Sequence, residues 1–367
     1  MREYPLELLE KLKRYETVTQ AYGMDIVLKK SPSESRSGFM DPYEIAALGK
    51  TKEHVGEKNE GIPPLPVLVE LMRDSMGFPN LNLNEKEIYT KYEKKQFDGN
   101  EVELWRYYLR RGSRKKRPAF LMIHGGGWVG GTVYVVENFC KLIAERADAV
   151  VFNIEYSKAP EKPFPNGLRD CYHALEYIYQ HAEEYGVDRE RIAIGGDSAG
   201  GNLAIAAAML ARDRHKPYVR LLAAAYPCTV KCDAAAEGYH WSENAYEISD
   251  EQRGLIAGCL GLGRPVPFGG DPLDRMCMED EKDIYNPYYS PMLDPDKSNM
   301  PKTLIMTSEF DGLRQQDEFY GMQLIAAGNE VRVVRYGGIS HAAVDRLGHI
   351  PQAEDMADEI VKAILEM

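Results

Sequence analysis

The sequence contains few cysteines, and none has the spacing of a disulfide framework or a zinc site. The six cysteines among 367 residues are scattered, without a Cys-x-x-Cys pair or a partnering series of histidines. Several lie in apolar segments of helix or strand type. We therefore expect reduced cysteines, several of them in the core, and no metal site.

Positive net charge, long apolar runs and cofactor motifs are also missing. The formal net charge of −12 argues against nucleic acid or an anionic membrane as the main partner. No run approaches transmembrane length, and Met1–Pro5 is charged where a signal peptide is apolar, which predicts a cytoplasmic protein without a membrane partner. With neither a dinucleotide fingerprint nor a phosphate loop, no cofactor is expected. The basic run from Arg110 to Arg117 is interpreted as a solvated turn.

The chain does have enough apolar sequence for a large core. Hydrophobic residues make up 44% of it. Short apolar strands, such as Pro118–Ile123, Ala149–Tyr156 and Leu221–Tyr226, alternate with amphipathic helices. This alternation predicts an α/β fold with a mostly parallel central sheet flanked by helices.

One serine stands where an apolar strand turns sharply into a helix. The strand ends near Ile194, glycines surround Ser198, and a helix-forming run follows. The spacing Gly196-x-Ser198-x-Gly200 is that of a nucleophile elbow, where neighbouring side chains would clash with the strained serine. A structural strand-to-helix turn is the alternative. We favour a catalytic serine because strand and helix both lie where an elbow needs them.

A second glycine-rich stretch lies upstream. The apolar strand ending at Ile123 runs into His124-Gly125-Gly126-Gly127. Consecutive glycines let backbone N–H groups approach a ligand closely, as an oxyanion hole requires. A flexible glycine loop is the alternative, and the abrupt run after a buried-type strand argues against it.

The two motifs, HGGGW and GDSAGG, together resemble the hormone-sensitive-lipase-like family of α/β-hydrolase esterases. Residues 155–161, followed by 163–165, are similar to the family's YRLAPE and PFP segment, with Ser157 and Lys158 in place of Arg-Leu. Residues 286–291 are similar to its NPY-x-SP segment. The resemblance covers roughly residues 88–367 and implies the α/β-hydrolase fold with a helical cap.

The resemblance also implies roles for the glycine loop. Backbone N–H groups of Gly126, Gly127 and Ala199 are expected to bind the oxyanion. His124 is expected to shape the loop without reacting, and Asp197 to join neighbouring loops by hydrogen bonds.

A serine nucleophile needs a histidine base and a carboxylate that holds the base's tautomer. In α/β-hydrolases the acid and then the histidine follow the serine along the chain. His341 directly follows a strand and is the predicted base, with His349 as its rival. Asp311, at a strand end between the elbow and the histidine, is the predicted acid, with Glu309 and Asp317 as alternatives.

Two loops depart from the family pattern. Gly312 stands where the family has proline, and Ala342 follows the base where glycine is usual. Neither change removes a reacting group, so the predicted catalytic residues are Ser198, Asp311 and His341.

The chain divides into a predicted core and a two-part cap. Residues 1–87 are predicted to form an N-terminal helical cap segment, because Leu6–Ala21 and Leu65–Met76 have amphipathic helical spacing. A disordered or independent extension is the alternative. Residues 88–228 and 291–367 are predicted as the α/β-hydrolase core, and 229–290, where the alternation breaks, as a cap insertion.

The combined prediction is a serine carboxylesterase acting on small short- to medium-chain acyl esters. A deacetylase of sugar or xenobiotic esters and an acyltransferase are alternatives within the enzyme class. Receptors with this fold resemble these esterases but lack the catalytic histidine, so His341 favours an enzyme over a non-catalytic small-ligand receptor. The resemblance also predicts a homodimer formed through a sheet edge.

Overall fold

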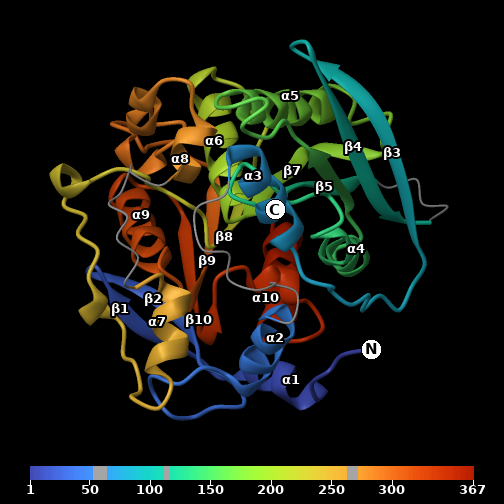
Figure 1. The fold of residues 1–367 in the computed structure, drawn as a ribbon. Coiled ribbons are helices and arrows are strands. Elements are labelled where there is room, and N and C mark those ends of the chain that lie inside the picture. The colour runs from blue at the N-terminus through green and yellow to red at the C-terminus, as the bar shows by residue number, and fades with distance from the viewer. Residues whose placement is uncertain (53–63, 111–115, 263–271) are drawn as a thin grey trace.

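The computed structural model describes residues 1–52, 64–110, 116–262 and 272–367 (Figure 1). Most of the predicted basic turn (111–115) lies outside the described residues, as do residues 53–63 and 263–271. The described strands are β1 (Glu16–Ala21), β2 (Met24–Lys29), β3 (Ile88–Phe97), β4 (Asn100–Leu109), β5 (Arg117–Ile123), β6 (Val150–Glu155), β7 (Val187–Asp197), β8 (Leu221–Ala225), β9 (Lys302–Phe310) and β10 (Val331–Ser340). The described α-helices are α1 (Leu6–Arg14), α2 (Pro42–Lys52), α3 (Leu65–Ser75), α4 (Glu137–Arg146), α5 (Asn166–Gln180), α6 (Ala199–Asp213), α7 (Arg253–Leu260), α8 (Pro272–Cys277), α9 (Arg314–Ala326) and α10 (Pro351–Leu365).

These strands form one sheet in the order β1-β2-β10-β9-β8-β7-β5-β6-β4-β3. Neighbours from β2 to β6 pair in parallel, whereas the hairpins β1–β2 and β3–β4 are antiparallel and lie at opposite ends of the sheet (Figure 1). The predicted mostly parallel sheet is confirmed. Because parallel strands end at the same edge, the loops after β5, β7, β9 and β10 meet there.

Helices cover both faces of the sheet, as predicted. Along β5, Leu121 and Ile123 belong to the apolar core that includes α5 and α6. Phe120 and Met122 point to the opposite core, which includes α4 and α10. This alternation is the period-2 pattern of a strand buried on both sides.

The predicted helix over Leu6–Ala21 is wrong beyond Arg14. Residues 16–29 form the β1–β2 hairpin, and β2 pairs in parallel with β10. They therefore extend the sheet and do not form part of a helical cap. The β-branched run at Thr17 and Val18 favours a strand, and backbone pairing outweighs the helical apolar spacing.

The two segments predicted as cap contact each other. Met40, before α2, packs against Tyr246, Ile256 and Leu260. The backbone N–H of Met40 also donates to the Gln252 side chain at 2.7 Å. The division of the chain into core and cap stays a prediction.

Candidate active site

Ser198 lies at the sharp turn between β7 and α6. Its backbone has φ 54° and ψ −121°, a conformation that costs energy for a residue with a side chain. A Cβ on Gly196 would lie 2.4 Å from the carbonyl carbon of Gly200, and one on Gly200 would lie 2.1 Å from the Ile123 carbonyl oxygen. The turn therefore needs a glycine on each side of the serine.

The structure brings the predicted serine, base and acid into one chain of hydrogen bonds. Ser198 Oγ donates to His341 Nε2 at 2.8 Å, and His341 Nδ1 donates to Asp311 Oδ2 at 2.6 Å. The other Asp311 oxygen accepts the backbone N–H of Leu313 at 2.9 Å, which fixes the carboxylate. These residues come from the carboxyl ends of β7, β10 and β9.

His341 has a raised pKa. Burial alone would lower the pKa of His341, but the charge and hydrogen bond of Asp311 outweigh burial and raise this pKa above its usual value. Since the paired carboxylate favours the imidazolium form, His341 is suited to accept a proton from Ser198.

The alternative residues have other partners. His349 Nδ1 pairs with Glu3 Oε2 at 2.8 Å, and Glu309 accepts a backbone N–H of β10 at 2.7 Å. Asp317 accepts the hydroxyl of Thr307 at 3.1 Å. None of these contacts reaches the Ser198–His341 pair.

The glycine loop lines the same cavity as Ser198. Gly126 and Gly127 have φ values of 126° and 59°, and a Cβ on Gly126 would lie 2.2 Å from the Gly130 carbonyl oxygen. Among the described residues, the N–H groups of Gly126 and Gly127 have no hydrogen-bond acceptor. Ala199 is the first residue of α6, so its N–H has no acceptor within the helix.

His124 and Asp197 hold this loop. His124 Nδ1 donates to the Gly125 carbonyl at 2.7 Å, and Asp197 accepts the Gly125 N–H at 2.8 Å. The predicted hydrogen-bonding role of Asp197 is thus confirmed. Burial lowers the pKa of His124 to about 4, so the ring is neutral at pH 7.

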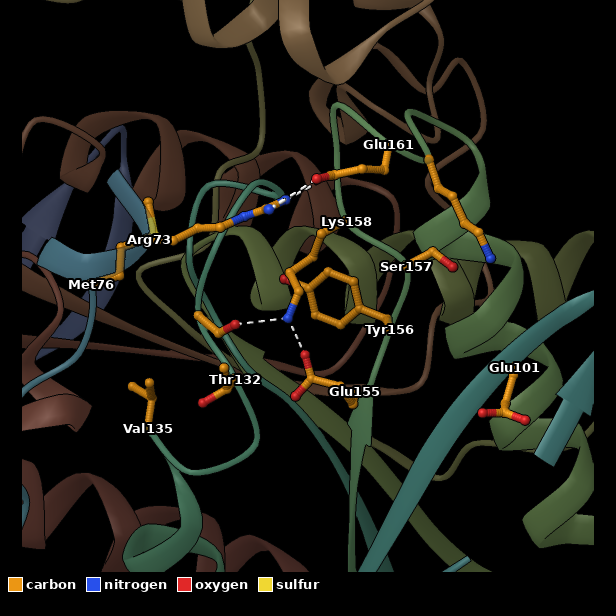
Figure 2. Close-up of a pocket in the computed structure, with 12 residues that line it drawn as sticks. Arg73, Met76, Glu101, Thr132, Val135, Glu155, Tyr156, Ser157, Lys158 and Glu161 are labelled. Carbon is orange, nitrogen blue, oxygen red and sulfur yellow. Dashed lines mark hydrogen bonds and ion pairs between the residues drawn. The ribbon is translucent and has the colours of Figure 1, made fainter. Parts of the chain in front are cut away.

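A second cavity of about 450 Å³ lies beside the loop. Figure 2 shows Lys158 pointing between the loop and the end of β6, where its Nζ pairs with the Glu155 carboxylate and donates to the Gly131 carbonyl, the latter at 2.8 Å. The lysine that departs from the family motif therefore fastens the far end of the glycine loop. Arg73, in the same view, pairs with Glu161 at 2.7 Å.

The main cavity opens in front of Ser198 and has a volume of about 740 Å³. Its apolar lining comes from both predicted cap segments and from the segment just before α4. The apolar residues are Leu48, Met76, Phe78, Val135 and Leu255. A cavity of this size accommodates a small organic ligand.

Asp345 also lines this cavity and was not among the predicted site residues. Its Oδ1 atom is buried without a hydrogen-bond partner among the described residues. Burial and the nearby Asp197 carboxyl raise the pKa of Asp345. Its place four residues after His341, in the same loop, was the available signal.

The loop after His341 accommodates its departure from the family pattern. Ala342 has φ 62°, in the left-handed region, where glycine is the usual choice. In the loop after Asp311, the carbonyl of Gly312 accepts the indole N–H of Trp241 at 3.1 Å. Both altered residues therefore fit beside an assembled site.

Comparison with known families agrees with this architecture. A family model described as alpha/beta hydrolase fold matches residues 120–345, more than half of the chain. The chain belongs to the α/β-hydrolase family. The resemblance to its hormone-sensitive-lipase-like branch is confirmed.

This α/β-hydrolase is similar to several curated esterases. It is 34% identical over 221 residues to an arylesterase of Saccharolobus solfataricus, which covers 60% of the chain and 66% of the arylesterase. It is 31% identical over 242 residues to carboxylesterase NlhH of Mycobacterium tuberculosis, covering 66% and 71% of the two chains. The matched segment thus spans just under two thirds of the arylesterase.

Solved structures extend the likeness. EstE1, a thermophilic carboxylesterase cloned from a metagenomic library, superposes with a TM-score of 0.67 at 26% identity, covering 77% of this chain and 90% of EstE1. The hyperthermophilic esterase of Pyrobaculum calidifontis gives a TM-score of 0.70 at 25% identity, covering 90% and 99%. The α/β-hydrolase fold therefore extends over most of the chain.

Proposed function

We propose that the protein is a serine carboxylesterase that hydrolyses small short- to medium-chain acyl esters. The observation that carries the proposal is the chain of hydrogen bonds of 2.8 Å and 2.6 Å from Ser198 through His341 to Asp311, at the wall of a 740 Å³ cavity. The esterase names of its relatives support the same activity.

In the proposed first step, Ser198 Oγ attacks the ester carbonyl carbon while His341 Nε2 takes the hydroxyl proton. The carbonyl oxygen becomes an oxyanion and is bound by the N–H groups of Gly126, Gly127 and Ala199. Because backbone N–H groups are held by the fold, donors of this kind stabilise developing charge without reorganisation. Collapse of the intermediate expels the alcohol, which takes the proton from His341, and leaves an acyl-enzyme.

In the second step, water replaces the alcohol. His341 removes a proton from the water, whose oxygen attacks the acyl carbon of the ester on Ser198. The intermediate again collapses, the acid leaves, and His341 returns the proton to Ser198 Oγ. Asp311 keeps the proton on Nδ1 throughout, so that Nε2 remains the base.

The proposal is tested by hydrolysis of nitrophenyl esters whose acyl chains increase in length. We expect turnover to peak at short to medium chains and to fall for long chains, because the cavity has a volume of only about 740 Å³ and is lined by apolar side chains of both predicted cap segments. The same esters incubated without the protein are the control for non-enzymatic release, and a nitrophenyl ether of matched size, which has no acyl carbon, tests whether turnover needs an ester. No turnover across the whole series would contradict the proposal.

Localisation and oligomeric state are the remaining predictions. No helix in the described ranges combines the length and apolarity needed to cross a bilayer. Cytoplasmic residence stays a prediction. So does the homodimer, for which the sheet edges in the described structure are β1 and β3.

A further inference from the structure

A buried glutamate from α2 reaches the loop that carries the proposed base. Glu44 is fully buried, and its Oε1 accepts the backbone N–H of Ser340 at 2.9 Å and the Ser340 hydroxyl. Ser340 ends β10 and directly precedes His341. The N-terminal segment therefore contacts the catalytic loop through a side chain that was not predicted to matter.

Arg346 completes this contact from the other side of the loop. Its Nη2 donates to Glu44 Oε1 at 2.9 Å and to the His341 carbonyl at 2.8 Å. Its Nε lies 2.9 Å from Glu44 Oε2. The Glu44 carboxylate and the Arg346 guanidinium thus hydrogen-bond the backbone before and after the His341 Cα atom.

The loop needs these hydrogen bonds. His341 is followed by Ala342, whose left-handed φ of 62° is unfavourable for a residue with a Cβ. The hydrogen bonds from Glu44 and Arg346 offset this conformational cost and limit the positions that the His341 imidazole can adopt. The same helix also contributes Leu48 to the wall of the main cavity, one turn after Glu44.

A buried ion pair is weak evidence for a purely stabilising role, because desolvation of both charges cancels much of their attraction. Here the pair also hydrogen-bonds the backbone of Ser340 and His341. We propose that Glu44, acting through Arg346 and Ser340, is a positioning residue for the base His341, so that α2 completes the catalytic site. The inference rests on the proposed esterase function.

Glu44 also sets the electrostatics around the base. The titratable and charged groups around His341 are Asp311 after β9, Asp197 after β7, Asp345 and Arg346 in the turn Ala343–Arg346, Tyr226 after β8 and Glu44 of α2. The Arg346 charge acts to lower the pKa of His341, and the Glu44 carboxylate neutralises that charge. Without Glu44, the pKa of His341 is expected to fall.

The test compares Glu44→Gln and Arg346→Lys with the unmodified full-length chain on a short nitrophenyl ester. We expect Glu44→Gln to lower kcat about 10- to 100-fold with little change in KM, because small misplacements of a catalytic group have effects of this size. The acid limb of its kcat/KM profile is expected to move to lower pH, since His341 must be neutral to act. Arg346→Lys keeps the positive charge but loses the guanidinium that contacts both Glu44 and the His341 carbonyl. It is therefore expected to lower kcat without moving the acid limb of the pH profile.

Asp355→Asn is the matched control. Asp355 pairs with Lys29 at 2.5 Å, with side chains only 1% and 2% exposed, and this pair also joins the N-terminal segment to the body of the protein. Asp355 does not line the cavity that contains Ser198 and His341. We expect Asp355→Asn to lower the melting temperature while kcat and the acid limb stay unchanged.

NMR titration of the His341 imidazole gives a readout that does not depend on turnover. A folded Glu44→Gln variant with the original kcat, acid limb and His341 titration would overturn the inference. The inference would also be overturned if Glu44→Gln and Asp355→Asn lowered kcat to the same extent and neither shifted the acid limb of the pH profile. If Glu44→Gln does not fold, an Arg346→Lys variant with unchanged kcat overturns it instead. Failure of the proposed function is distinct, because the unmodified chain would then not hydrolyse the esters, whereas the titration would still report on Glu44.

Discussion

Replacing Ser198 with alanine is expected to lower kcat for ester hydrolysis by roughly 10⁶-fold, the size of loss that follows removal of a serine nucleophile. Without Oγ no acyl-enzyme can form, and only the oxyanion donors and the cavity remain to accelerate attack by water. The backbone strain at φ 54° is held by neighbouring glycines, so the variant is expected to fold. The measurement is steady-state hydrolysis of a short nitrophenyl ester.

Ser157→Ala is the matched control. Ser157 lines the second cavity, and its substitution removes a hydroxyl of the same kind without touching the Ser198–His341 pair. We expect its kcat to stay within about twofold of the original, as surface substitutions away from a site usually have small effects. Hydrolysis retained by Ser198→Ala would remove Ser198 from the mechanism.

Replacing Asp311 with asparagine is expected to lower kcat by about 10⁴-fold. An amide N–H facing Nδ1 would favour the tautomer with its proton on Nε2, and that nitrogen could then no longer accept the proton of Ser198. The loss of the carboxylate also removes the main influence that raises the pKa of His341. The acid limb of the remaining activity should therefore lie at lower pH.

Asp317→Asn separates the predicted acid from its alternative. Burial and the neighbouring Asp311 charge raise the pKa of Asp317 well above its usual value, and its carboxyl group accepts the Thr307 hydroxyl at 3.1 Å. We expect kcat to change by no more than about threefold, because Asp317 hydrogen-bonds neither Ser198 nor His341 and the substitution changes little volume. A large loss in Asp317→Asn with little loss in Asp311→Asn would assign the acid to Asp317.

The elbow and the sheet could be predicted because their signals are local. The residues around Ser198 specify a strand, a glycine-flanked turn and a helix within one short stretch. From Pro118 to Ile123 the residues of β5 are all apolar, which is typical of a strand buried between two helical layers. The order of serine, acid and histidine along the chain then indicates Asp311 and His341.

The N-terminal hairpin could not be predicted from its own sequence with the same ease. Most of β1 is solvent-exposed, so it lacks the apolar alternation that marks a half-buried strand. Its partner β2 is held by β10, whose residues Val334–Tyr336 lie about three hundred positions further along the chain. The β-branched residues near Val18 were the one local signal, and the apolar spacing of α1 obscured it.

The contact from Glu44 to the loop that carries His341 could not be predicted either, because it joins segments that are far apart in the sequence. Glu44 and Arg346 are ordinary charged residues in their own segments, and 302 positions separate them. Only the fold reveals that both are buried and that their hydrogen bonds converge on the backbone of Ser340 and His341. Sequence patterns identify groups that react, whereas positioning residues depend on long-range pairing.

The central claim, that Ser198 is the nucleophile, is tested most directly by treating the protein with a fluorophosphonate and locating the adduct by peptide mass spectrometry. We predict one adduct per chain, on the peptide that contains Ser198, with parallel loss of ester hydrolysis and no labelling of Ser198→Ala. Labelling at another residue, or full hydrolytic activity in a chain that carries the adduct on Ser198, would contradict the account.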